Sequence, residues 1–419
     1  MAATPPRVLL VHPRNPRELT YPLGLACLAA TAKKAGAFIA GCDLRVHAPR
    51  KLVSLLRRFP FDYVGICALS TTAADASRVV SLVRRMQPSA FVVLGGPHAT
   101  LAPEDALART RADALVRGDG EAAFAALVSG KLEAPGLLLR GSGPIPDIHG
   151  ERCLDLLPHA DRSTFPIVDY YAQGILGTPR RTSVVATRGC RLSCQYCSAK
   201  ALSGGAFRTR SVDDVIDEVR ALHRDHAVDT IVFEDDNLVL DRDYAMSLWQ
   251  ALARKAPGLR FDLPNGVHPG LVDEDMVVAM ARAGVRSLAF GVESMVGPDR
   301  ARLHRDFELA HLVRVADRAR RVGIVTTGYF LIGLPGQSPG DALRQVPAIR
   351  ALPFDMVHVS VLVDLPGPSQ SRPSVTWKST RKAMYAGIYA DGRRISRLAR
   401  LGGANIDALT RLARSAMRI

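Results

Sequence analysis

The sequence has few aromatic residues and no long apolar run. Aromatic side chains make up 6% of the 419 residues, too few for the interleaved stacking platforms that bind single-stranded nucleic acid. No apolar run reaches the roughly 18 residues that a membrane-spanning helix needs, and from the first residues we expect no signal peptide. We therefore expect a cytoplasmic protein with neither a nucleic-acid nor a membrane partner.

Acidic residues are also in short supply. The chain has 55 basic and 40 acidic residues, which gives a formal net charge of +15. The excess is mainly arginine, it is spread along the chain, and no run of five basic residues occurs. We favour compositional drift as the cause, with anionic small-molecule ligands second and nucleic acid third. The apolar content of 47% excludes a disordered chain, and the length suggests about two to three domains.

Cysteine is scarce as well, and its odd count of seven argues against a disulfide framework. Three cysteines form the pattern C-x-x-x-C-x-x-C, and no fourth Cys or His follows at zinc-finger spacing. Three thiolates without a fourth ligand suit a 4Fe–4S cluster with one open iron. The clustered residues are Cys190, Cys194 and Cys197, and the scattered ones are Cys27, Cys42, Cys67 and Cys153.

Short apolar runs alternate with helical patterns in the first third of the chain. Continuous apolar strands that alternate with helices predict a doubly wound parallel sheet, whose ligands bind at the carboxyl ends of its strands. The expected strands are 7–12, 42–47, 62–67, 90–94 and 113–116, and the helices are 23–35, 51–58, 73–86 and one from about 121.

Small and glycine-rich turns follow three of these strands. They are residues 70–72, 95–100 and 117–121. Glycine lets a ligand approach the backbone closely, and helix N-termini offer N–H groups to phosphate. No G-x-G-x-x-G follows the first strand, so a dinucleotide ligand is not favoured.

The second half repeats the strand–helix pattern six times, which predicts a partial α/β barrel, open on one side, with its active residues at the carboxyl ends of the strands. The expected strands are 182–187, 230–234, 259–267, 286–292, 325–332 and 356–363, with helices at 212–224, 274–283 and 310–322. Candidate residues at strand ends are Glu234, Asp235, Asp236, Asn237 and Glu293, with Asn265 and His268 more simply read as turn residues. The expected domains are 1–135, a connector over 136–180, the barrel over 181–365, and a C-terminal loop and helical tail over 366–419.

Segments 21–30, 64–72, 92–100 and 117–121 resemble, in order and spacing, the cobalamin-binding domain that precedes many radical SAM enzymes. The cysteine trio, with Tyr196 before its third member, resembles the radical SAM signature. The family usually has Glu where Asp119 stands, and no D-x-H-x-x-G occurs, so the resemblance implies cobalamin without a histidine below the cobalt. His98 is an alternative axial ligand, although we favour a packing role in its turn.

The resemblance also implies which residues contact each cofactor. The three clustered cysteines hold the 4Fe–4S cluster, Glu293 accepts hydrogen bonds from the ribose or amino group of S-adenosylmethionine (SAM), and Leu331 lies against adenine. Glu often stands in the family where this chain has Gln337. The expected SAM contacts are Tyr196, Glu234, Asp235, Glu293, Leu331 and Gly333. The expected cobalamin contacts are Pro13, Ser70, Thr71, Thr72, Gly95, Gly96, His98, Ala99, Gly118, Gly120 and Glu121.

By resemblance, the function is methyl transfer to an unactivated carbon of a small molecule such as a natural product. One SAM methylates cobalamin, and a second supplies a 5′-deoxyadenosyl radical that abstracts a hydrogen from the substrate. A flavodoxin-like or ferredoxin-like protein supplies electrons. The alternatives are a non-methylating radical enzyme, which cyclises or rearranges its substrate, and a cobalamin sensor or scaffold with a vestigial barrel. Methylthio transfer to tRNA would need a second cysteine trio.

The C-terminal region carries a loop and a basic helical pattern. Residues 364–373 resemble a loop of the same family, and residues 378–400 have a basic helical pattern that predicts a helical tail. Trp377, Tyr385 and Tyr389 are candidates for a substrate pocket, but the spacing of the two tyrosines favours a packing stripe.

Overall fold

The computed structural model describes residues 4–15, 20–173, 180–363, 374–390 and 392–400. Its described residues form two compact units. The first unit contains the described residues up to 170 and residues 199–210. The second unit contains the described residues of 171–198, residues 211–363 and the C-terminal helices. None of the helices in the described part of the chain is long and apolar enough to cross a membrane.

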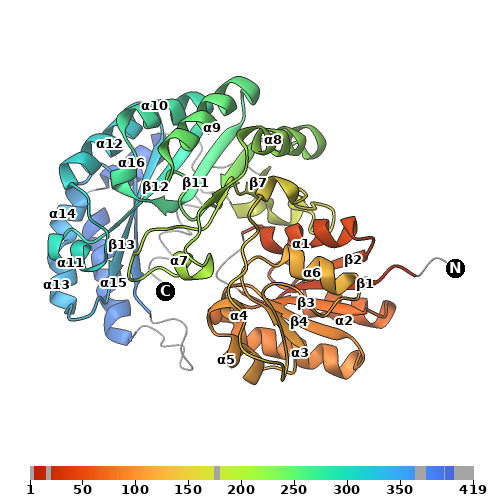
Figure 1. The fold of residues 1–419 in the computed structure, drawn as a ribbon. Coiled ribbons are helices and arrows are strands. Elements are labelled where there is room, and N and C mark those ends of the chain that lie inside the picture. Colours follow the sequence, from red (N-terminus) through yellow and green to blue (C-terminus); the bar gives the residue numbers. More distant parts are fainter. Residues whose placement is uncertain (1–3, 16–19, 174–179, 364–373, 391, 401–419) are drawn as a thin grey trace. The chain divides into compact units, whose positions relative to one another are not determined.

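A six-stranded sheet forms the centre of the first unit (Figure 1). Its strand order is β2-β1-β3-β4-β5-β6, and all neighbours are parallel except β5 and β6. Helix α1 packs against α6, and α2 packs against α3. The strands are β1 (Arg7–His12), β2 (Phe38–Asp43), β3 (Tyr63–Cys67), β4 (Phe91–Gly95), β5 (Ala114–Val116) and β6 (Leu137–Leu139). The helices are α1 (Leu23–Lys34), α2 (Pro49–Arg58), α3 (Ala73–Met86), α4 (Pro97–Leu101), α5 (Pro103–Ala108) and α6 (Glu121–Val128).

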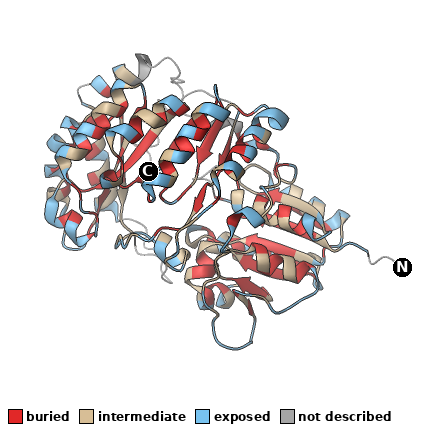
Figure 2. Ribbon diagram, turned by 45° about the horizontal axis from the view of Figure 1, so that its top comes forward, coloured by how far each residue is buried: buried red, intermediate tan, exposed pale blue. Residues whose placement is uncertain are grey.

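The apolar strands explain why this sheet is doubly wound. Residues 8–11 of β1 are fully buried, and β3 and β4 each contribute three buried residues. Figure 2 shows these buried strands between helices whose exposed sides face outward. Because helices cover both faces, the strands need apolar side chains at consecutive positions. The expected doubly wound parallel sheet is confirmed.

Two expectations for the first unit are corrected by the structure. The second strand is residues 38–43 rather than 42–47, because the backbone turns after Asp43, whose carboxylate accepts a hydrogen bond from the Arg45 amide at 2.9 Å. The sequence did not indicate this strand because Gly41 interrupts its apolar pattern. A Cβ at Gly41 would lie 2.7 Å from Thr164, so the close packing there requires glycine. The region expected as a connector also supplies β6, which pairs with β5, and residues as far as 170 belong to the first unit.

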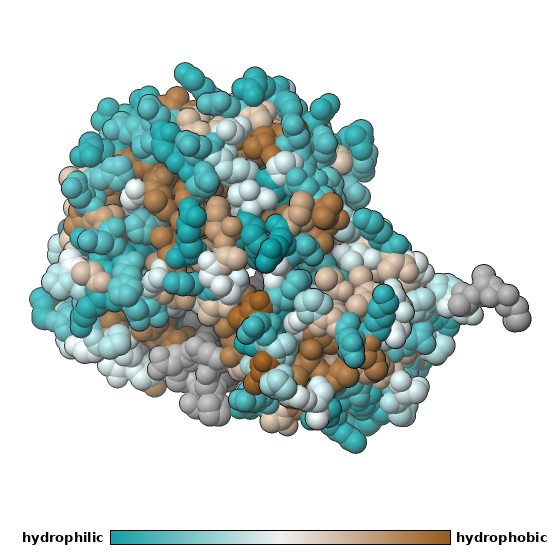
Figure 3. Space-filling model, in the orientation of Figure 1, coloured by the Kyte–Doolittle hydropathy of each residue, from teal (hydrophilic) through white to brown (hydrophobic). Residues whose placement is uncertain are grey.

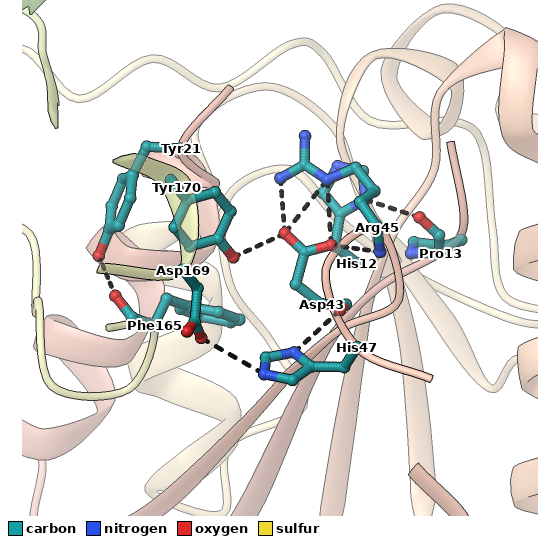
Figure 4. Close-up of polar contacts among 9 residues, drawn as sticks. All are labelled: His12, Pro13, Tyr21, Asp43, Arg45, His47, Phe165, Asp169 and Tyr170. Atoms are coloured by element: carbon teal, nitrogen blue, oxygen red, sulfur yellow. Dashed lines mark hydrogen bonds and ion pairs between the residues drawn. The ribbon is translucent and has the colours of Figure 1, made fainter. Parts of the chain in front are cut away.

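A buried polar network joins residues 165–170 to Asp43 at the carboxyl end of β2 and to Tyr21 (Figure 4). The Tyr170 hydroxyl donates to Asp43 Oδ2 at 2.8 Å, and Arg45 Nη2 donates to the same oxygen at 2.7 Å. Tyr21 donates to the Phe165 carbonyl at 2.9 Å. Burial opposes ionisation of Asp43, but the hydrogen bonds and charge of Arg45 outweigh it and lower its pKa. This network holds residues 165–170 against the carboxyl end of β2.

The second unit is built on six parallel strands in the order β14-β13-β12-β11-β10-β7 (Figure 1). Neighbours in the chain are neighbours in the sheet, and the described strands β7 and β14 do not pair to close it. The expected partial barrel is confirmed. The strands are β7 (Arg181–Val184), β10 (Thr230–Phe233), β11 (Arg260–Val267), β12 (Val285–Glu293), β13 (Val325–Ile332) and β14 (Met356–Val361). The helices are α8 (Val212–His226), α9 (Arg242–Lys255), α10 (Glu274–Ala283), α11 (Gly297–Arg302), α12 (Leu309–Arg321), α13 (Pro339–Arg344), α14 (Val346–Ala351), α15 (Val375–Tyr389) and α16 (Arg393–Arg400).

Local signals set the helix ends of this unit. Ser211 accepts a hydrogen bond from the Asp214 amide at the start of α8, and Asp273 accepts one from Met276 at the start of α10. Gly284, with φ of 102°, ends α10 in the left-handed region. The helical pattern expected over 378–400 is confirmed, and the structure divides it into α15 and α16 with Gly392 between them. Figure 3 shows hydrophilic residues spread over the visible surface, with apolar residues in small groups.

The two tyrosines of α15 cover the free edge of β14. The Tyr389 hydroxyl accepts from the Val357 amide at 2.8 Å, and the Tyr385 hydroxyl accepts from the Val359 amide at 2.9 Å. Their rings stack with centroids 6.4 Å apart. These bonds satisfy edge N–H groups that would otherwise be open to pairing. The structure thus uses both tyrosines for packing, as the favoured interpretation expects.

The network around Asp43 gives a test of stability. Tyr170→Phe removes a hydrogen bond to a buried carboxylate and should lower the free energy of unfolding by about 1.5–3 kcal/mol at pH 7. Because the native pKa of Asp43 is lowered, its stabilisation is present above an unfolded pKa of 3.8 and is lost as the pH falls. The difference between variant and unaltered chain should therefore shrink in acid. Urea denaturation of the full chain measures it.

Tyr63→Phe is the matched control, since the Tyr63 hydroxyl makes no hydrogen bond within the described residues. Equal losses of stability in the two variants would contradict the role given to Tyr170.

Candidate active site

The three clustered cysteines lie on the loop that follows β7. Cys190 is buried, Cys194 is half-buried and Cys197 is exposed. The Cys197 amide donates to the Cys194 carbonyl at 3.1 Å, which closes a turn between these two residues. Burial raises the pKa of the Cys190 thiol, and the neighbouring Asp236, Cys197 and Cys194 raise it further. The three thiols therefore share one small region of the loop.

Two carboxylates after β10 hold the start of this loop. Asp235 accepts hydrogen bonds from the Thr187 amide at 2.5 Å, the Thr187 hydroxyl at 2.6 Å and the Ala186 amide at 3.1 Å. Asp236 accepts a hydrogen bond from the backbone of Gly189, the residue before Cys190. Burial raises the pKa of Asp235 to about 7 in spite of its hydrogen bonds. The loop is thus anchored at its start by buried acceptors.

These contacts change the interpretation of the acidic residues after β10. The Asp235 carboxylate accepts hydrogen bonds from the loop and so anchors it, and its expected contact with SAM stays a prediction. Glu234 accepts a hydrogen bond from the Ser183 hydroxyl at 3.1 Å. Asn265 donates to the Asp235 carbonyl at 3.1 Å, and His268 accepts from the Gly270 amide at 3.1 Å, as turn residues do.

A segment after α11 contacts the cysteine loop from another direction. The Gln195 amide donates to the Leu303 carbonyl at 3.2 Å, and Arg305 Nη1 lies 3.7 Å from Cys194 Sγ. Arg305 is 4% exposed, and its guanidinium also donates to the carbonyls of Gly291 at 3.0 Å and Val267 at 3.3 Å. The site therefore includes a buried cation next to a cysteine sulfur.

Sequence reasoning missed Arg305. In the sequence, only its position shortly after the expected fourth strand pointed to a role at the site. Arginine is too frequent in this chain for that position alone to identify a functional residue.

Tyr196 and Glu293 form the polar pair at the centre of this site. The Tyr196 hydroxyl donates to Glu293 Oε1 at 2.7 Å, and Arg305 Nε lies 4.0 Å from the same oxygen. Burial raises the pKa of Glu293, although Tyr196 and Arg305 oppose the shift. Burial also raises the pKa of Tyr196. At the end of β12, Glu293 has φ of 66°, a conformation that non-glycine residues rarely adopt and that is frequent at functional sites.

Gly291 leaves room for this pair. A Cβ at Gly291 would lie 2.2 Å from Arg305 Nη2 and 2.7 Å from Glu293 Oε1. Any side chain would therefore displace the two charged groups. The position needs glycine because of close approach, although its backbone is ordinary.

An apolar cluster lies beside Tyr196. Leu331 packs with Leu303 and Leu334, and Tyr196 and Leu362 lie against them. Gly333 donates its amide to Gln337 Oε1 at 2.8 Å, so Gln337 caps the turn after β13. The expected SAM residues Tyr196, Glu293 and Leu331 are thus together in one place.

The residues present fit a 4Fe–4S cluster by their chemistry. The loop offers three thiols within eight residues, the donor type that iron–sulfur clusters use. No group of three or more His, Cys, Asp or Glu side chains in the described ranges has the spacing of a metal site. The fit therefore rests on the thiols, on their anchored loop and on the charged groups beside them.

In the first unit, the residues expected to bind cobalamin gather at the carboxyl ends of the strands. The sheet extends in opposite directions from β1 and β3, and ligands of doubly wound sheets bind at such a point. The gathered residues are Pro13 after β1, the turn Ser70–Thr72 after β3, Gly95, Gly96, His98 and Ala99 at the end of β4, and Gly118, Gly120 and Glu121 after β5.

The backbone at this edge leaves space for a ligand. A Cβ at Gly95 would meet no atom within 4 Å, so the end of β4 faces open space. Gly96 adopts φ of 94° and directs the chain into α4. These features fit a bulky cofactor that lies against the ends of the strands.

His98 is turned toward the protein. It is 4% exposed, its Nδ1 lies 3.1 Å from Ser70 Oγ, and its Nε2 lies 3.2 Å from Asp105 Oδ2. Burial lowers its pKa. Both ring nitrogens face protein groups, as the packing interpretation of His98 expects.

The anchoring of the cysteine loop gives a second test. Asp235→Ala leaves three buried donors without an acceptor, each of which costs about 1–3 kcal/mol. The free energy of unfolding should fall by about 3 kcal/mol or more, and the iron bound per chain after anaerobic reconstitution should fall with it. Asp225→Ala, which alters an exposed carboxylate at the end of α8, is the control. Unchanged iron content in Asp235→Ala would contradict the anchoring role.

Comparison with known proteins agrees with this arrangement. The family model of the B12 binding domain matches residues 14–128, and that of the Radical SAM superfamily matches residues 184–344. An uncharacterized methyltransferase of Pyrococcus horikoshii is 28% identical, over 83% of this chain and 76% of its own length. The cytidylyl-2-hydroxyethylphosphonate methyltransferase of Streptomyces wedmorensis is 26% identical, over 82% of this chain and 76% of its own length.

A solved structure shows the same fold. It is the radical S-adenosylmethionine methyltransferase TsrM from Kitasatospora setae with cobalamin and a 4Fe–4S cluster bound, at a TM-score of 0.73 and 20% identity. The match covers 86% of this chain and 76% of TsrM. The chain therefore belongs to the radical SAM enzymes with an N-terminal B12-binding domain, which use a 4Fe–4S cluster, SAM and cobalamin.

Proposed function

We propose that this chain, a cobalamin-dependent radical SAM methyltransferase, methylates an unactivated carbon of a small molecule. The observation that carries the proposal is the group formed by the cysteine loop, the buried Arg305 and the Tyr196–Glu293 pair. A loop that holds only thiols would suit simple electron transfer. A cation and an anion beside those thiols instead suit the binding of a charged molecule next to the cluster.

SAM is such a molecule, because its amino acid part carries both an ammonium and a carboxylate. We assign the carboxylate to Arg305, whose Nε and Nη2 donate to backbone carbonyls while its Nη1 is directed at the cysteine loop, 3.7 Å from Cys194 Sγ. We assign the ammonium or the ribose hydroxyls to Glu293, whose Oε1 lies 4.0 Å from Arg305 Nε. Leu331, Leu334 and the Tyr196 ring supply an apolar wall for adenine.

Burial sharpens the effect of these groups. Glu293 is 7% exposed and Arg305 is 4% exposed, so their charges act in a poorly solvated place. Such groups orient a bound ligand without reorganising, which is the main way in which a protein assists cofactor chemistry. When bound, the cluster supplies the electron that cleaves SAM, and cobalamin carries the methyl group.

We further propose a small-molecule substrate, such as a natural product, rather than tRNA. Two of the relatives above are named as methyltransferases, and one name specifies a cytidylyl-phosphonate. Cys27, Cys42 and Cys67 lie on α1, β2 and β3 and do not form a second trio in the sequence. The electron donor in our proposal is a flavodoxin-like or ferredoxin-like protein, and we place the enzyme in the cytoplasm.

The proposal predicts the products made from SAM. The reconstituted full chain, given methyl-labelled SAM, cobalamin and a strong reductant, should form 5′-deoxyadenosine and S-adenosylhomocysteine, with label in an added substrate once that substrate is found. Cys194→Ala should reduce 5′-deoxyadenosine to background, because the cluster loses a ligand. Liquid chromatography with mass detection measures all three.

Cys153→Ala is the matched control, since Cys153 is exposed and lies outside the cluster loop. It should keep full product formation. Formation of 5′-deoxyadenosine without any S-adenosylhomocysteine would favour the non-methylating alternative. Neither product from the unaltered chain would favour a sensor with a vestigial barrel.

A further inference from the structure

The segment that follows the cluster cysteines belongs to the first unit. Residues 199–210, here called the strap, begin two positions after Cys197 and end immediately before Ser211, which starts α8 of the second unit. At its beginning, the strap forms the short helix α7 (Ala199–Leu202), which packs on α4. Helix α4 starts directly after Gly96, one of the residues assigned to cobalamin.

An ion pair fixes the far end of the strap. Arg208 Nη1 donates to Asp119 Oδ2 at 2.6 Å and to the Glu151 carbonyl at 2.9 Å. The side chains of Arg208 and Asp119 are only 11% and 18% exposed. Poor solvation strengthens such a charge-assisted hydrogen bond and makes the loss of either partner costly.

The surroundings are shaped to hold Arg208. Asp119 Oδ2 also accepts from the Glu151 amide at 3.0 Å, and the Asp119 amide donates to the His149 carbonyl at 2.8 Å. A Cβ at Gly150 would lie 2.7 Å from Arg208 Nη1, so glycine leaves the space that the guanidinium fills. Asp119 thus has its carboxylate directed at the strap, while its backbone belongs to the loop of residues 117–121 after β5.

We propose that Arg208 is a positioning residue that couples the cobalamin loop, residues 117–121, to the strap. The inference rests on the proposed function, because it takes that loop as part of the cobalamin site. The strap contacts two of the segments assigned to cobalamin, through α4 and through Asp119.

Hydrogen–deuterium exchange of the full chain tests the coupling without any cofactor. Arg208→Ala should speed amide exchange both in the strap and in the cobalamin loop, because each loses its anchor. Arg208→Lys keeps the charge and should restore slow exchange in most of both segments. Arg224→Ala is the matched control: it breaks an exposed arginine–aspartate pair on α8 and should change neither segment.

Cobalamin binding gives the second measurement. Hydroxocobalamin is titrated into the full chain, and free and bound forms are separated by equilibrium dialysis. Arg208→Ala should weaken cobalamin binding about tenfold, because the largely buried Asp119 carboxylate loses its cationic partner. Arg208→Lys keeps a cation there and should weaken binding by about threefold or less. Iron bound per chain should stay the same in both, which separates this effect from general loss of structure.

Gly150→Ala provides a second variant if Arg208→Ala does not fold. It keeps both charges and pushes the guanidinium away from its place, so it should show the same faster exchange and weaker binding. Faster exchange in the strap alone, with the cobalamin loop and the affinity unchanged, would overturn the proposal. Failure of the unaltered chain to bind hydroxocobalamin would instead refute the cobalamin site, while the exchange data would still decide whether Arg208 couples the two segments.

Discussion

The cysteine loop is held in place by the hydrogen bonds that Asp235 accepts from Ala186 and Thr187 at the carboxyl end of β10. These bonds set where the chain leaves the sheet, and therefore where the three thiols lie. Asp236 extends the anchor to Gly189. The segment of Leu303 to Arg305 then contacts the same loop and brings a buried cation to Cys194. The rest of the proposed chemistry depends on this placement.

The proposed SAM site follows from the same geometry. Glu293 takes a left-handed backbone conformation at the end of β12, and Gly291 leaves the space that its carboxylate shares with Arg305. The strained backbone of Glu293 and the burial of the charged Arg305 both cost folding free energy, so stability alone does not explain them. They are readily explained by a ligand that carries both charges.

Much of the fold and part of the site could be predicted from the sequence. Consecutive apolar residues predicted the parallel strands of both sheets, and cysteine spacing predicted the cluster loop. Arg305 and Arg208 could not be found in this way, because their partners Cys194 and Asp119 lie 111 and 89 residues away. Asp235 was expected at the site, but its structural role depends on burial that a single sequence does not reveal. The second strand was misplaced because Gly41 interrupts the apolar pattern, although close packing against Thr164 requires it.

The most direct test of the central claim is the electron paramagnetic resonance spectrum of the reduced, reconstituted full chain with and without SAM. If Cys190, Cys194 and Cys197 hold a cluster with one open iron, and Arg305 and Glu293 bind SAM as proposed, the 4Fe–4S signal should have g-values that shift when SAM is added. The shift should be lost in Glu293→Gln while the signal itself stays. A signal that does not respond to SAM, or one that persists after Cys190, Cys194 and Cys197 are all replaced by alanine, would contradict the account.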